Sequence, residues 1–142
     1  MSYDLKPRNK SVKGISMGLF TWPLYLQETG MGYILGYGEG KNPATYVYNT
    51  GNHGSPVSND GYRVSASEAK AMAMVARGFV SVNRFIEKQW EDVPENEREF
   101  LKSQKTFELG RPIYRTAWHE DRLKSIEEFA EFAEKSGGFR IT

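Results

Sequence analysis

Apolar side chains recur at three- and four-residue steps over residues 66–90, the longest periodic run in the chain. Ser65 and Glu68 form a capping-box pattern directly in front of this run, which predicts a helix start. Gly78 lies inside the expected helix, where glycine costs about 1 kcal/mol relative to alanine, so we expect another element to pack closely against it. Further apolar positions widen the face and predict a helix covered on more than one side: Ala71, Met74, Val75, Val82 and Phe85.

A second run with helical spacing covers residues 118–136 and places its apolar residues on one face. Glu120 and Asp121 suit the positive N-terminal end of a helix, and Lys135 suits the negative C-terminal end. Two consecutive glycines at 137–138 end the run. The pattern therefore predicts a second main helix.

Shorter patterns predict the remaining elements. Pro23 is tolerated in the first turn of a helix, so residues 21–29 predict a short helix that Thr21 caps. The glycine-rich residues 30–40 predict turns, and the charged segment around Pro94 predicts a turn and then a short helix. Alternating or β-branched residues predict short strands at 12–20, 45–48, 113–115 and 139–142.

These elements indicate an α+β fold, in which two main helices pack on a small sheet and helix content exceeds strand content. A mainly α fold is the alternative, because every expected strand is short. The chain has 142 residues, so we expect one globular domain spanning 1–142. Residues 1–13 are expected to form a flexible basic arm, because Asp4 alone balances four cations: Lys6, Arg8, Lys10 and Lys13.

Composition narrows the functional classes. The formal net charge of +1 gives no bulk electrostatic attraction to nucleic acid or to an anionic membrane. Without cysteine the chain cannot form disulfides, thiolate zinc sites or cysteine nucleophiles. Its polar opening does not match a secretory signal, and no apolar run is long enough to cross a bilayer. We therefore expect a cytoplasmic protein with no cofactor, no metal site and neither nucleic acid nor a membrane as partner.

Two loops are candidates for chemistry. The glycine-rich stretch from Gly36 to Lys41 suggests phosphate binding, because glycine lets backbone donors approach an anion, although its spacing matches neither the Walker loop nor the dinucleotide fingerprint. His53 lies in a polar loop and is the candidate general base or ligand-binding residue. A small enzyme or a nucleotide-binding domain built on these loops is the alternative function. The other histidine, His119, is expected to cap the second main helix.

Seven of the eight tyrosines lie before residue 63, together with Trp22, and three of these tyrosines adjoin glycine: Tyr33, Tyr37 and Tyr62. Amphipathic aromatics beside flexible backbone are typical of binding surfaces, although a tyrosine-rich core edge is the alternative. We therefore expect a non-enzymatic binding or accessory protein whose partner, a protein, docks on residues 22–62. A small polar ligand and a homo-oligomer remain open. The candidate binding residues are Trp22, Tyr37, Gly38, Lys41, Tyr48, Asn52, His53 and Asp60.

Five segments, in this order, resemble a small family of uncharacterised proteins from tailed phages of the T-even type and from bacteria. They are MSYDLKPRN, GLFTWPLYL, GMGYILGYG, SNDGYRVSASEAKAMA and FAEFAEKSGGFRI. The resemblance spans nearly the whole chain. It implies a single-domain accessory protein inside the cell, in the host cytoplasm if phage-encoded, and it supplies no catalytic residue, cofactor or substrate.

Overall fold

In the computed structural model, which describes residues 2–37, 52–103, 107–108, 111–112 and 118–142, the chain forms a four-stranded antiparallel sheet. Its strands are β1 (Ser2–Pro7), β2 (Ile15–Gly18), β3 (Tyr62–Val64) and β6 (Phe139–Ile141). The strand order is β2-β1-β6-β3. Because β6 pairs with both β1 and β3, the C-terminal residues join the first strand to the middle of the chain.

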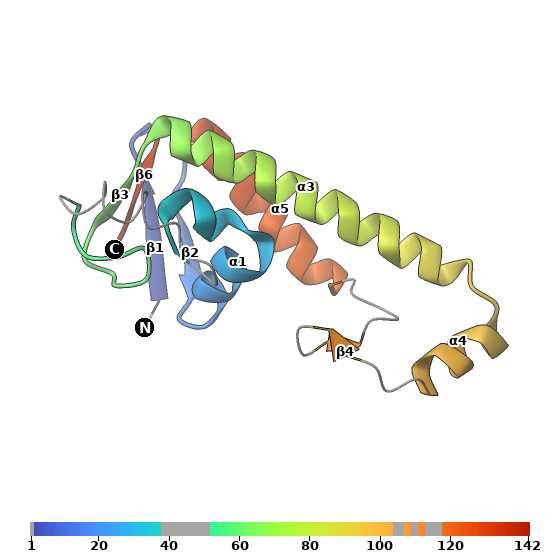
Figure 1. Ribbon diagram of the computed structural model, residues 1–142. Helices are drawn as coiled ribbons and strands as arrows, with labels where there is room; N and C mark the ends of the chain where they lie inside the picture. Colours follow the sequence, from blue (N-terminus) through green and yellow to red (C-terminus); the bar gives the residue numbers. More distant parts are fainter. Residues whose placement is uncertain (1, 38–51, 104–106, 109–110, 113–117) are drawn as a thin grey trace.

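The helices lie on one side of this sheet, and the longest of them runs well past it (Figure 1). They are α1 (Thr21–Thr29), the 3₁₀ helix η1 (Met31–Leu35), α3 (Ala66–Glu91), α4 (Glu95–Ser103) and α5 (Glu120–Lys135). α5 packs alongside α3, and α4 follows the end of α3 that is farthest from the sheet (Figure 1). In a second sheet, β4 (Phe107–Glu108) pairs antiparallel with β5 (Arg111–Pro112). Among the described residues, no helix is both long enough and apolar enough to span a bilayer.

The α+β prediction is confirmed, and helix exceeds strand. The capping box is also confirmed: Glu68 N donates to Ser65 Oγ at 3.1 Å, while Ser65 N donates to Glu68 Oε1 at 2.9 Å. The short helix beyond Pro94 and the C-terminal strand occur as expected. These elements rest on local signals, and the local signals agree with the final packing.

Three expectations were wrong. Residues 1–13 are not a flexible basic arm, because β1 is an inner strand that buries Leu5 completely. Part of the glycine-rich segment forms η1 rather than turns alone, since Gly30 and Gly36 adopt left-handed φ angles of 87° and 72° at its two ends. Thr21 does not cap α1, whose N-cap is Phe20. The strand β3 was not expected, and the expected strands at 45–48 and 113–115 lie outside the described residues.

The core lies between the sheet and the helices. Alternate residues of the strands point into it, namely Tyr3, Leu5, Met17, Tyr62, Val64, Phe139 and Ile141. Trp22 of α1 packs against Phe129 of α5 and Phe139 of β6, with ring centroids 5.4 and 6.4 Å apart. The intervening strand residues point to the other face of the sheet, which none of the described helices covers.

Candidate functional site

Trp22, the first of the sequence-predicted binding residues, belongs to the core and not to a partner surface. Its side chain is completely buried, and its indole Nε1 donates to the carbonyl oxygen of Pro56 at 2.9 Å. Tyr25 and Tyr62 are also buried, so the predicted surface over residues 22–62 loses three of its large aromatics. The alternative, an aromatic core edge, is what the structure shows at these three positions.

Burial raises the pKa of Tyr62 to about 12, and the neighbouring Glu68 carboxylate adds to this shift. The hydroxyl has no hydrogen-bond partner among the residues that the structure describes. Because the folded state holds this proton more tightly than an unfolded tyrosine of pKa 10.0 does, the free energy of unfolding should fall as the pH rises from about 10 to about 12. Urea unfolding at several pH values measures this, and Tyr62→Phe should show a smaller fall. An identical pH dependence in that variant would contradict the assignment.

The polar loop at 52–61 is held by hydrogen bonds to β3 and by hydrogen bonds between Ser55 and Ser58 within the loop. Asn52 extends the edge of the sheet: its Nδ2 donates to the carbonyl oxygen of Arg63 and its Oδ1 accepts from Arg63 N, both at 2.8 Å. The amide nitrogen of His53 also donates to Asn52 Oδ1, while the His53 side chain is exposed, as is Asp60. Asn52 therefore has a clear structural role, whereas no described residue pairs with the imidazole of His53.

The remaining sequence candidates do not combine into a site. Tyr37 is partly buried and packs against the core. Gly38, Lys41 and Tyr48 lie outside the described residues, as does most of the stretch from Gly36 to Lys41.

α3 presents an uncharged stripe to solvent on the side away from the core. The exposed fractions of Met74, Val82 and Phe85 are 74%, 57% and 63%. Gly78 and Ser81 lie among them and are exposed. Together with the partly exposed Ala71, these residues form what we call the α3 stripe: Ala71, Met74, Gly78, Ser81, Val82 and Phe85.

The α3 stripe overturns two expectations about this helix. A Cβ added at Gly78 would meet no atom within 4 Å, so no element of the described chain packs closely there. Of the five positions expected to be covered on a second side, Val75 packs against the core and Ala71 is partly exposed, while Met74, Val82 and Phe85 face solvent. The sequence pattern was correct about their apolar character, but apolar spacing alone does not show what covers a face.

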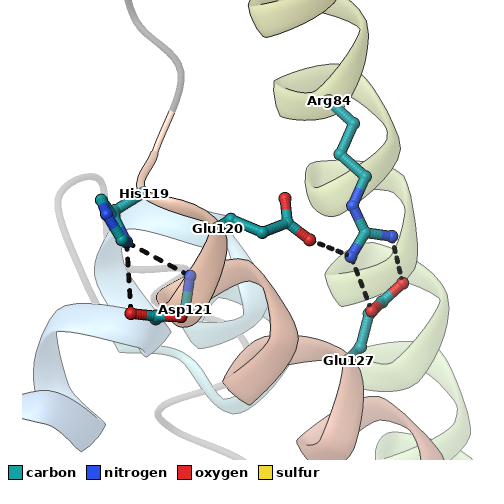
Figure 2. A network of polar contacts seen from close by, with 5 residues as sticks. All are labelled: Arg84, His119, Glu120, Asp121 and Glu127. Carbon is teal, nitrogen blue, oxygen red and sulfur yellow. Dashed lines mark hydrogen bonds and ion pairs between the residues drawn. The ribbon is translucent and has the colours of Figure 1, made fainter.

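α3 and α5 are joined beside this stripe by ion pairs (Figure 2). Arg84 donates to Glu127 at 2.5 and 2.9 Å and to Glu120 at 2.8 Å. One heptad earlier on α3, Arg77 donates to Glu134 at 2.6 Å. The bonds from Arg84 lower the pKa of Glu127, because they stabilise its charged form. Such half-exposed pairs add little stability, but they direct both guanidinium groups toward α5 and away from the stripe.

Two lysines border the α3 stripe on the side where Arg77 and Arg84 lie. Lys70 and Lys88 are exposed, and neither forms an ion pair with another residue in the described part of the chain. The stripe is therefore uncharged along its length and cationic near both ends.

His119 is the N-cap of α5, as expected, because its Nδ1 accepts a hydrogen bond from Asp121 N at 3.3 Å (Figure 2). The Asp121 carboxylate lies 3.6 Å from the same nitrogen, and both side chains are largely exposed. Within the described ranges, no group of three or more potential metal-binding side chains comes together.

A scan against protein-family models found no match for this chain, and searches of the curated proteins and of the solved structures found none. The resemblance to a phage and bacterial family therefore stays a prediction.

Proposed function

We propose that this protein is a non-enzymatic binding protein that docks an amphipathic helix of another protein on the α3 stripe. The observation that carries this proposal is the solvent exposure of Met74, Val82 and Phe85 on one helix face without a charged residue among them. Contiguous exposed apolar surface on a folded protein marks an interaction site. A cytoplasmic accessory role, which the family resemblance implies, is part of the same proposal.

The spacing of the stripe favours a helix as the docked element. Ala71, Met74, Gly78, Ser81 and Phe85 follow one another at alternating steps of three and four residues, the pattern by which one helix packs along another. The small residues Gly78 and Ser81 lie at the centre, where they allow close approach, and the larger Met74 and Phe85 lie on either side. A partner helix can therefore lie near α3 at its middle and be held by apolar side chains toward its ends.

Charge favours a different protein over a second copy. In a symmetric antiparallel pair of α3 helices centred near Gly78, Lys70 of one copy would lie beside Lys88 of the other, and like charges repel. A partner helix with carboxylates along the matching flank would instead pair with both lysines. The proposed partner is thus an amphipathic helix with an acidic flank.

Two synthetic three-heptad peptides with the same leucine face test this proposal, one with glutamates along its flanks and one with lysines. We expect the acidic peptide to bind the full chain and to shift backbone amide resonances of ¹⁵N-labelled protein along the α3 stripe. The lysine peptide should bind at least about tenfold more weakly. Equal affinity for both peptides, or shifts confined to other surfaces, would contradict the proposal. A dimer of the free protein in sedimentation that Met74→Ser combined with Phe85→Ser abolishes would show that a second copy occupies the stripe.

Three variants sharpen the test. Met74→Ser combined with Phe85→Ser should weaken binding of the acidic peptide at least about thirtyfold, since buried anchors dominate such interfaces. Phe20→Ser is the matched control, because Phe20 is 86% exposed and lies outside α3. Gly78→Ala should stabilise the free protein by about 1 kcal/mol, yet weaken peptide binding where the two helices approach most closely. A gain of stability with unchanged binding would show that the docked helix does not approach Gly78.

A further inference from the structure

The open face of the sheet carries a row of cations that cross-strand pairing brings together. Lys6 of β1 lies opposite Arg140 of β6, and Arg140 lies opposite Arg63 of β3. All three side chains are exposed on the face that the helices leave open. With strands about 4.8 Å apart, the row is about 10 Å wide. Arg8 continues the pairing of β1 beyond its last residue, since its amide nitrogen donates to the carbonyl oxygen of Gly138 at 2.8 Å.

Within the described chain, no carboxylate neutralises this row. None of the four side chains forms an ion pair or a side-chain hydrogen bond with another described residue. The two nearby carboxylates are hydrogen-bonded elsewhere: Asp4 accepts from Ser16 Oγ, and Glu68 accepts from Ser65 N in the capping box. Like charges directly opposite one another in a sheet are destabilising, so this face is under electrostatic repulsion that a bound anion would relieve.

The cations border a hollow of about 560 Å³, a size typical of small-molecule sites. Its lining includes the four cations Lys6, Arg8, Arg63 and Arg140 and one carboxylate, Glu68. The aliphatic surfaces of Pro7 and Ala66 add apolar walls, and Gly138 keeps the backbone segments close together. The hollow thus combines an excess of positive charge with walls that suit the organic part of a ligand.

We propose that this hollow binds a small organic phosphate that carries at least two negative charges. Arginine presents paired N–H donors that match two oxygens of one phosphate group, and three of the four cations are arginines. No exposed aromatic side chain lies among the lining residues, so the site lacks the stacking platform that single-stranded nucleic acid requires. The site shares no residue with the α3 stripe, and its proposal stands independently of helix docking.

Calorimetric titration of the full chain with inorganic pyrophosphate and with methyl phosphate tests the site. We expect saturable binding of both, tighter for pyrophosphate because it carries more charge. Combining Arg63→Gln with Arg140→Gln should weaken pyrophosphate binding at least about tenfold. The matched control combines Arg122→Gln with Lys124→Gln, which removes the same charge from α5, and its affinity should stay within about twofold of wild type.

Thermal unfolding of the same variants supplies a second readout. Because Arg140 lies between two cations, Arg140→Gln should raise the melting temperature of the free protein at low salt while it reduces the stabilisation by pyrophosphate. An equal loss of affinity in the control pair would show that the overall charge of the protein, and not this hollow, attracts pyrophosphate. Absence of saturable binding would overturn the proposal outright. So would pyrophosphate-induced shifts of backbone amide resonances that occur only outside the lining residues.

Discussion

Replacing Trp22 with alanine is expected to lower the free energy of unfolding by about 3–5 kcal/mol, the usual range for removing a large aromatic from a core. The indole is completely buried and contacts two aromatic rings, Phe129 and Phe139. Its loss also leaves the carbonyl oxygen of Pro56 without the donor that now lies 2.9 Å away. Since single domains are stable by only about 5–15 kcal/mol, this variant should be close to unfolding under mild conditions.

Urea unfolding followed by circular dichroism measures this loss. Trp22→Phe is the control, because it keeps an aromatic ring in the core and removes only the hydrogen bond and part of the volume. We expect the phenylalanine variant to lose less than half as much stability as the alanine variant. A loss below about 1 kcal/mol for Trp22→Ala would show that the side chain is not a core residue. That result would favour the sequence prediction that Trp22 belongs to a binding surface.

Gly138→Ala is expected to be the second most damaging change. Gly138 has a φ of +97°, and an added Cβ would lie 2.7 Å from the carbonyl oxygen of Val64 and 3.1 Å from Ala66 N. The left-handed backbone conformation alone costs about 1–3 kcal/mol for a residue with a side chain. The collision adds to this, because the atoms in the way belong to the backbone between β3 and α3 and cannot rotate aside.

Gly137→Ala separates these two contributions. Gly137 also has a positive φ, +67°, but its nearest neighbours lie 3.9 Å from an added Cβ, so only the conformational cost applies. We expect both variants to unfold at lower urea concentration than wild type, with Gly138→Ala lower than Gly137→Ala. Equal midpoints for the two variants would show that the backbone of Val64 and Ala66 moves away without resistance.

Two sequence predictions about exposed residues were wrong for the same physical reason. The aromatics of residues 22–62 had the composition of a binding surface, yet Trp22 and Tyr62 fill the core because α5 and β6 pack against them. The cations of residues 1–13 had the composition of a solvated arm, yet β1 alternates apolar and polar side chains and takes an inner place in the sheet. In both cases, composition described the residues correctly and their neighbours decided their role.

What the sequence determined by itself is local: the apolar faces along α3 and α5, the capping box at Ser65, and the glycines that follow the last residues of α1 and α5. Such features depend on residues within a few positions of each other, so spacing alone identifies them. The tertiary structure decided which faces are covered, because coverage depends on chain segments far apart in sequence. Only the pairing of β1, β6 and β3 places Lys6, Arg140 and Arg63 side by side, and only the placement of α5 leaves the α3 stripe in solvent.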